Sequence, residues 1–548
     1  MSEVPRVFTV DGRPFFPLGG QARNSSGYNA AEAETAFQAV KQLHGNTLEI
    51  PVYWEQVEPE EGGFDLSPVQ ALLAGARRHD LKLVLLWFAT WKNGDMDYAP
   101  AWVKTDPQRF KRVIAPTGVP LWVLSSHCQA TWEADRRAFT ALCRYLKEHD
   151  SEHTVVALQI ENEPGILGSD RDYGPEAQAS FEGPVPRELV AALKARDLAP
   201  KAALTAAAEI WREAGGREEG SWPELFGEAA GEIMTAWSIA TYIDRLAEAG
   251  KAILAIPMYL NVWLGEQGWR LPGETYPAGG AVGKVLDVYK AATPHLDLVA
   301  PDIYIADAKG YEATCALYAR DDNPLFVPES APWGSNAWLV FRALADYQAI
   351  GYHIFGVESI LGQDGSVRPE ARMMADSLRC AAAAIPLLLR YQGTDRIHAI
   401  VQEEGMAEQT LDLEGYIGMV EFGEGPMRWA AKDWRHAPES VGQPEAADLP
   451  RRARGLVVQA ERHLFYLVGA DFRLHLRPKV APEVACDAAY SNPSLMHSLS
   501  PYISVDEGYL DDDGTFYVDR RRNGDETNHG TWVEPDTGVV RIVMCPQG

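Results

Sequence analysis

The chain has 548 residues, of which 46% are hydrophobic and 23% charged, a composition typical of a globular protein with two or three domains. Its 77 acidic and 50 basic residues give a formal net charge of −27, which argues against nucleic acid or an anionic membrane as a partner and leaves an uncharged substrate open. No run of about 18 apolar residues occurs, so no membrane span is expected.

The first residues and the cysteines bear on the cellular compartment. Residues 1–6 lack the basic start and apolar core of a signal peptide, so we expect a cytoplasmic protein, although removal of a leader would leave the same sequence. Six cysteines are scattered through the chain without a CxxC pair. They predict reduced thiols rather than a disulfide framework or a zinc site.

Buried strands alternate with helical patterns over the first 390 residues. The expected strands cover residues 14–20, 46–53, 81–88, 155–160, 252–263, 296–305, 324–329 and 352–358. The expected helices cover residues 67–79, 131–147, 230–249, 335–349 and 369–388, and an earlier helix contains the apolar positions Ala36, Phe37, Val40 and Leu43. An insertion at about 165–227 is expected to be partly helical, over 187–196 and 202–214. This alternation predicts an α/β fold, a (β/α)8 TIM barrel over residues 1–390. A doubly wound open sheet is the alternative, and it fits less well because no glycine-rich phosphate loop follows the first strand.

The texture of the sequence changes after residue 390. Short strand patterns at 455–459, 464–468 and 539–544 are separated by Gly, Asp and Pro turns. They predict a smaller all-β accessory domain over residues 391–548. Two roles stay open for it: packing against the barrel, or contact between the subunits of a homo-oligomer.

Polar side chains gather where the predicted strands end, which is where TIM barrels place their active sites. The fourth strand runs into Glu161-Asn162-Glu163-Pro164, and Glu329 ends the seventh. Other strand ends supply carboxylates, amides and aromatic rings: Glu49, Tyr53, Trp87, Trp91, Asn261, Trp263, Asp302, Tyr304 and Glu358. No HxH, HExxH or clustered Cys/His spacing occurs, so we expect neither a metal nor an organic cofactor.

Carboxylates among aromatic rings, without a metal, suit glycoside hydrolysis. One carboxyl group protonates the leaving oxygen while a second attacks the sugar or activates water, and the faces of Trp and Tyr rings receive the C–H faces of sugars. The competing interpretation makes Glu163 and Glu329 structural carboxylates, salt-bridged or capping a helix. The Asn before Glu163 and the Pro after it favour the catalytic interpretation.

Several motifs resemble known glycosidases. Asn162-Glu163-Pro164 and Glu329 resemble the acid/base and the nucleophile of the retaining glycosidases of clan A. The segment 159–163 resembles the β-galactosidases of glycoside hydrolase family 35, and so does 46–48 together with Trp54 and Glu58-Pro59, a pattern shared loosely with family 42. The runs 455–459 and 523–526 are similar to the accessory β-domain of a bacterial family 35-like branch.

The resemblance implies a retaining exo-β-glycosidase, most similar to β-galactosidases, that acts on an oligosaccharide or glycoside. Glu163 would be the acid/base, with a raised pKa, and Glu329 the nucleophile. Tyr304 resembles the tyrosine that donates a hydrogen bond to the nucleophile. The further predicted substrate contacts are Asn162, Trp333, Tyr53, Asn261, Trp87 and Glu358.

The end of the fourth strand poses a geometric problem. Strict alternation puts Glu161 and Glu163 on one face and Asn162 on the other. For Asn162 and Glu163 both to face the pocket, the strand end must bulge or turn. We therefore place Glu161 behind the pocket, in a supporting position.

Two alternatives stay open at this point. The enzyme could act on another sugar or a plant-derived oligosaccharide, or the chain could be a catalytically silent carbohydrate-binding protein on the same fold. Linkage specificity and oligomeric state do not follow from the sequence.

Overall fold

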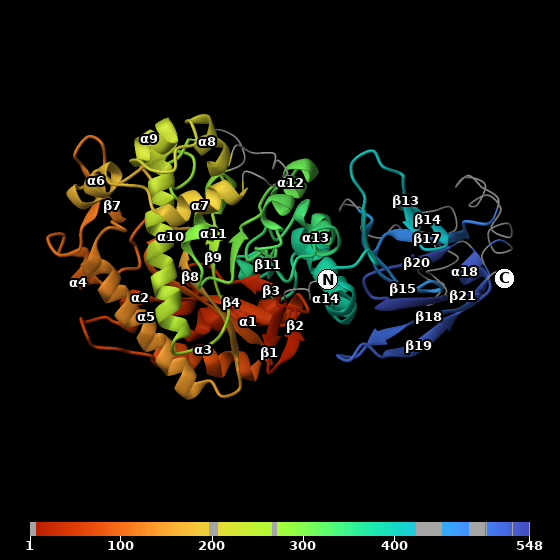
Figure 1. Ribbon diagram of the computed structural model, residues 1–548. Coiled ribbons are helices and arrows are strands. Elements are labelled where there is room, and N and C mark those ends of the chain that lie inside the picture. The colour runs from red at the N-terminus through yellow and green to blue at the C-terminus, as the bar shows by residue number, and fades with distance from the viewer. Residues whose placement is uncertain are drawn as a thin grey trace.

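The computed structural model describes residues 7–196, 206–265, 271–422, 452–481, 499, 501–528 and 530–546. Figure 1 shows a barrel with surrounding helices beside a β-rich C-terminal region, with helices α13 (Asn336–Ala345) and α14 (Arg372–Tyr391) between them. The predicted α/β barrel followed by an all-β region is confirmed.

The barrel sheet contains seven parallel strands in the order β10-β9-β8-β5-β4-β3-β11. Their bounds are β3 (Leu18–Gln21), β4 (Thr47–Tyr53), β5 (Lys82–Lys92), β8 (Val155–Asn162), β9 (Met258–Val262), β10 (Leu298–Pro301) and β11 (Tyr352–Phe355). From β3 to β10, each strand of this sheet lies beside the next one in the chain, and the last strand, β11, pairs with the first, β3, as a singly wound barrel requires.

The remaining gap, between β10 and β11, is filled by the irregular segment 325–330. Ile303 forms a parallel bridge with Ser330, and Val327 forms one with Tyr352. The Ile303 amide donates to the Glu329 carbonyl at 2.8 Å. The predicted seventh strand is therefore present as an irregular segment with few backbone hydrogen bonds to its neighbours, and it closes the barrel.

Side chains on the strands alternate between two apolar cores. On β5, Val84, Leu86 and Phe88 point into the barrel interior. Leu85 and Trp87 belong to the larger core between the strands and the surrounding helices. This parity follows from the two-residue repeat of a strand, and it decides which strand-end residues can reach a pocket.

The helices around the barrel are α1 (Ala30–Gln42), α3 (Ser67–Arg78), α5 (Gln129–His149), α10 (Ala230–Lys251), α11 (Leu286–Ala292), α12 (Ala308–Tyr318), α13 and α14. The insertion carries α6 (Pro175–Glu182), α7 (Arg187–Arg196), α8 (Ala207–Glu213) and α9 (Trp222–Phe226). The shorter elements are β1 (Phe8–Val10), β2 (Arg13–Phe15), α2 (Trp54–Val57), α4 (Ala101–Lys104), β6 (Arg112–Ile114) and β7 (Pro120–Leu124).

Some element boundaries differ from the predicted ones for identifiable reasons. The strand expected from residue 252 begins at Met258, because α10 continues to Lys251 and the amides of Ile253 and Leu254 still bond back to the Gly250 carbonyl. The first helix, whose start was not predicted, begins at Ala30, where the Asn29 side chain accepts two amide hydrogen bonds.

The C-terminal region consists of two antiparallel sheets that face each other across a second apolar core, which contains Val457, Leu467, Leu474 and Ile542. One sheet has the order β12-β15-β16-β21-β18-β19, with bounds Ile397–Val401, Arg454–Glu461, Leu464–Ala470, Val539–Met544, Tyr502–Leu510 and Phe516–Arg522. The other has the order β13-β14-β17-β20, with bounds Glu408–Leu413, Tyr416–Phe422, Phe472–Pro478 and Thr531–Val533.

This region packs against the barrel helices. Ile397 and Leu456 belong to the same apolar core as the barrel helices, and Arg454 on β15 donates to the Ser377 hydroxyl on α14 at 2.8 Å. Of the two roles left open for the tail, packing against the barrel is therefore observed.

Two further expectations can be compared with the structure. Within the described ranges, no helix combines the length and apolarity needed to cross a bilayer. The described cysteines are free thiols: Cys128, Cys143, Cys315, Cys380 and Cys545. The sixth, Cys486, lies outside the described residues.

Candidate active site

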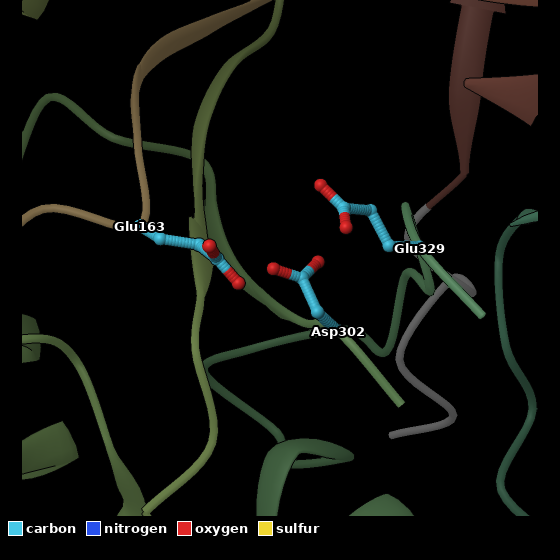
Figure 2. A group of neighbouring side chains, drawn as sticks. All are labelled: Glu163, Asp302 and Glu329. Carbon is cyan, nitrogen blue, oxygen red and sulfur yellow. The ribbon is translucent and has the colours of Figure 1, made fainter. Parts of the chain in front are cut away.

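Three carboxyl groups meet at the C-terminal end of the barrel strands, on the floor of a pocket of about 740 Å³. Glu163 follows β8, Asp302 follows β10, and Glu329 lies on the 325–330 segment; Figure 2 shows their side chains pointing toward one another. One oxygen of each lies within 4.8 Å of an oxygen of the other two. The other residues that line this pocket are Asn24, Lys92, Asn93, Trp263, Leu264, Tyr304, Ile305, Ala306, Asp307 and Phe355.

The end of β8 turns in the way that the sequence required. Glu161 and Glu163 both have positive φ, 61° and 45°, and the register against β5 shifts between Trp87 and Lys92. Left-handed backbone at two non-glycine positions interrupts the alternation of the strand. Glu161 consequently lies behind the pocket, close to Asp135 on α5, while Glu163 points into the pocket.

The Glu163 carboxyl is held in a state that can carry a proton. Burial and the negative charge of Glu329 raise its pKa to about 7, against the opposing effects of the Lys92 ammonium and a hydrogen bond with Asp302. Its backbone amide donates to the Asn261 side chain at 2.8 Å, which fixes the turn.

The Glu329 carboxylate faces three donors. Gln21 Nε2 lies 2.7 Å and Asn261 Nδ2 lies 3.4 Å from Oε1, and the Tyr304 hydroxyl lies 2.6 Å from Oε2. Donors directed at a carboxylate stabilise its negative charge. The predicted bond from Tyr304 to Glu329 is thus present.

Asn261 contacts the carboxyl groups of Asp302 and Glu329 and the backbone amide of Glu163 from beneath the pocket. Its Nδ2 lies 2.9 Å from Asp302 Oδ2 and 3.2 Å from Asn162 Oδ1, in addition to its contact with Glu329. It is fully buried and does not line the pocket. Its predicted role as a substrate contact is therefore corrected to one of holding the carboxyl groups.

Asn162 also acts within the protein. It is fully buried, its Oδ1 accepts from Gln159 Nε2 at 3.1 Å, and its Nδ2 donates to Asn93 Oδ1 at 3.3 Å. The predicted contact with a sugar hydroxyl is wrong, because the turn at Glu161 and Glu163 leaves Asn162 in the wall behind the pocket.

Two predicted aromatic contacts, Trp87 and Tyr53, do not reach the pocket. Trp87 belongs to the core on the helix side of β5, where its indole N–H donates to Asp135 at 2.8 Å, so strand parity excludes it. Tyr53 is buried under the loop after β3: its hydroxyl donates to the Asn24 carbonyl at 2.6 Å and its ring stacks on Tyr28.

Glu358 and Trp333 are likewise absent from the pocket wall. Glu358 accepts hydrogen bonds from the Arg23 amide, at 3.2 Å, and from the Ser26 hydroxyl, and so it fastens the loop after β3. Trp333 is 46% exposed, four residues after Glu329. Both predictions placed the residue near the right strand end but did not give its direction.

The structure adds residues around the carboxyl groups that the sequence did not single out. Gln21 is the last residue of β3, one position beyond the predicted strand. Lys92 and Asn93 enter because β5 continues to Lys92 rather than ending at residue 88. Asp302 and Trp263 stood at predicted strand ends, and nothing in their spacing separated them from their neighbours.

The three carboxyl groups are also close enough to share a cation, and oxygen donors suit Mg²⁺ or Ca²⁺. Against this use, Gln21 and Tyr304 donate to both oxygens of Glu329, and Lys92 lines the same pocket. The expectation of no metal and no cofactor stays a prediction.

Comparison with known proteins relates part of the chain to glycoside hydrolases. The model of glycoside hydrolase family 42, described as Beta-galactosidase, matches residues 26–193, which include Glu163 and end before Glu329. Residues 374–534 match a family described as Domain of unknown function (DUF5597). The more specific resemblance to family 35 stays a prediction.

A beta-galactosidase from Xanthomonas manihotis is 27% identical over 190 residues, which cover 32% of this chain and 28% of the relative. The alignment thus spans less than a third of that relative's length. Among solved structures, a beta-galactosidase from Bacillus circulans sp. alkalophilus has a TM-score of 0.47 at 14% identity, covering 70% of this chain and 58% of that one. The beta-galactosidase from Halorubrum lacusprofundi has a TM-score of 0.46 at 16% identity, covering 67% and 58%.

Proposed function

We propose that the protein is a retaining exo-β-glycosidase of the β-galactosidase type. The observation that carries the proposal is the approach of the Glu163 and Glu329 carboxyl oxygens to within 4.8 Å on a pocket floor. Carboxyl groups about 5–5.5 Å apart are typical of retaining enzymes, whereas inverting enzymes need about 6.5–9.5 Å to admit a water molecule. The short separation supports double displacement.

In the first displacement, a Glu329 oxygen attacks the anomeric carbon and the bond to the leaving oxygen breaks. Glu163 gives its proton to that oxygen, which leaves as an alcohol. The donors on Glu329 from Gln21, Asn261 and Tyr304 hold the attacking carboxylate in place.

In the second displacement, Glu163 is ionised and takes a proton from water. The water oxygen attacks the anomeric carbon, the ester bond to Glu329 breaks, and the sugar leaves with its original anomeric configuration. Trp263, Tyr304 and Phe355 supply ring faces along the pocket, which suit the C–H faces of an uncharged sugar.

The proposal is tested with a panel of nitrophenyl β-glycosides and three proteins: wild type, Glu163→Ala and Glu329→Ala. We expect wild-type turnover to be highest on the galactoside and to fall by at least about 10²–10⁴-fold in either variant. Azide added to Glu329→Ala should give an α-glycosyl azide, which would identify the nucleophile.

Equal turnover in the three proteins would refute the assignment of both glutamates. Preferred turnover of another glycoside would keep the mechanism and replace the sugar. Binding without turnover would identify a silent carbohydrate-binding protein. A wild-type product of inverted configuration, seen by proton NMR, would exclude double displacement.

A further inference from the structure

The Asp302 carboxyl lies inside the site without a part in the steps above. It is 3% exposed, and in Figure 2 it points into the space between Glu163 and Glu329. Its Oδ2 accepts from Asn261 Nδ2 at 2.9 Å, whereas its Oδ1 is buried and finds no hydrogen-bond donor among the described residues. A buried oxygen of this kind requires either a donor or a proton of its own.

The charges of Glu163, Asp302 and Glu329 indicate that one of these three carboxyl groups is protonated. Three buried carboxyl groups within 4.8 Å cannot all be ionised without strong mutual repulsion, and Lys92 is the one basic side chain among the residues that line this pocket. Glu329 already accepts hydrogen bonds from three donors. The proton uptake therefore falls on Glu163 and Asp302.

We propose that Asp302 is a positioning residue for Glu163, with which it shares one proton, so that a proton is kept beside the leaving group at neutral pH. This inference rests on the proposed function, in which Glu163 is the acid. Burial first, and then the charges of Glu329 and Glu163, raise the pKa of Asp302 well above its ordinary range, as a shared proton requires.

The proton count balances over the catalytic cycle. At the start, Glu329 carries one negative charge and the Glu163–Asp302 pair carries one charge and one proton. When the pair gives its proton to the leaving oxygen, it gains a charge while Glu329 loses one by forming the ester. The total charge of the cluster stays constant, and the proton taken from water in the second step restores the pair.

Other titratable groups face the pair from the elements around it. These are Lys92 from β5, Glu49 from β4, Tyr259 from β9, Tyr304 after β10 and Glu329 from the 325–330 segment. Asp302 differs from Glu49, Tyr259 and Tyr304 because it alone among these four forms a hydrogen bond with Glu163.

The test is the pH profile of kcat/KM for wild type and Asp302→Asn on the best nitrophenyl glycoside. In wild type, the alkaline limb should lie near pH 7 or above. Asparagine removes a negative neighbour and can donate to the Glu163 carboxylate, so both effects favour ionised Glu163. The alkaline limb should therefore move to lower pH by about one unit or more.

Asp307→Asn is the matched control, because it removes the same charge from the exposed pocket rim and keeps an N-cap side chain for α12. Its alkaline limb should move much less than that of Asp302→Asn. If Asp302→Asn does not fold, as judged by circular dichroism, Asp302→Ser is measured with the same expectation.

An alkaline limb that stays in place in a folded Asp302 variant would overturn the shared proton, and so would a wild-type limb below about pH 5, whatever the variants do. Failure of the proposed function has a different signature, because wild type would then turn over no glycoside at any pH.

Discussion

Tyr304 contacts the proposed nucleophile through a single hydroxyl group. Its O–H donates to Glu329 Oε2 at 2.6 Å at the edge of the pocket. A hydrogen bond to a charged group contributes about 1.5–3 kcal/mol, so Tyr304→Phe should lower kcat/KM by roughly 10- to 100-fold. Steady-state kinetics on a nitrophenyl glycoside measures this loss.

Tyr276→Phe serves as the comparison, since Tyr276 makes an equally short bond, 2.6 Å, to the buried Glu232, and neither residue lines the pocket. This variant should lose stability while keeping kcat/KM close to wild type. Equal kinetic losses in the two variants would remove Tyr304 from the mechanism.

For individual residues, the sequence predicted residue types and strand ends better than the directions of side chains. Glu163 and Glu329 carried local signals, an Asn-Glu-Pro motif and a buried strand leading to an acid. The prediction for Trp87 was wrong because both of its neighbours are as apolar as it is. A continuously apolar strand does not show which of its side chains face the barrel interior. Asn261 bonds to residues more than 40 positions away, which no local pattern reveals.

The contact between β8 and α5 contains a second pair of buried acids, away from the pocket. Asp135 accepts from Trp87, Thr90 and Tyr242 at 2.7–2.9 Å, and Glu161 accepts from the Trp91 amide at 2.8 Å. Burial first, and then the charge of Asp135, raise the pKa of Glu161 well above its usual range.

This pair should make stability depend on pH. Between the ordinary pKa of glutamate, about 4.3, and the raised pKa of Glu161, the folded protein holds a proton that the unfolded chain has released, so stability falls as pH rises through this range. Glu161→Gln needs no proton. Its melting temperature relative to wild type should therefore increase between pH 5 and pH 8, as measured by differential scanning calorimetry.

Glu133→Gln, an exposed change on α5, gives the baseline for this comparison. A constant difference between Glu161→Gln and wild type across the pH range would show that Glu161 titrates as an ordinary glutamate.

Elements were predicted well where the pattern was long and regular, and less well at their ends. β8 and α7 appear where expected, while β5 extends four residues past the predicted end because Ala89 to Lys92 stay buried in the sheet. The 325–330 segment takes its expected position in the barrel, but it contacts its neighbours through isolated β-bridges instead of a continuous series of backbone hydrogen bonds. Such ends depend on neighbouring strands rather than on local preference.

For the whole molecule, Arg454 is a buried polar link between the barrel and the β-region. It is almost fully buried, donates to Ser377 on α14 at 2.8 Å, and lies 3.4 Å from Asp471. Arg454→Ala leaves Asp471 without this partner, so it should lower the free energy of unfolding by about 3 kcal/mol. Urea denaturation measures the change.

The exposed Arg187, which pairs with Glu219 at 2.8 Å, provides the reference. Arg187→Ala should change the free energy of unfolding by less than about 1 kcal/mol. Similar losses in both variants would mean that Arg454 contributes no more to stability than an exposed ion pair does. The proposed domain boundary at residues 390 and 391 falls at the C-terminal end of α14, the helix that this arginine holds.

The left-handed backbone at Glu163 creates a conflict between catalytic activity and the stability of the fold. A non-glycine residue in this conformation costs about 1–2 kcal/mol relative to an unstrained one. Glycine at this position would relax the chain and remove the proton donor in the same step. Selection for stability therefore favours glycine at position 163, whereas selection for turnover requires glutamate. A more stable protein has to arise through substitutions elsewhere in the barrel.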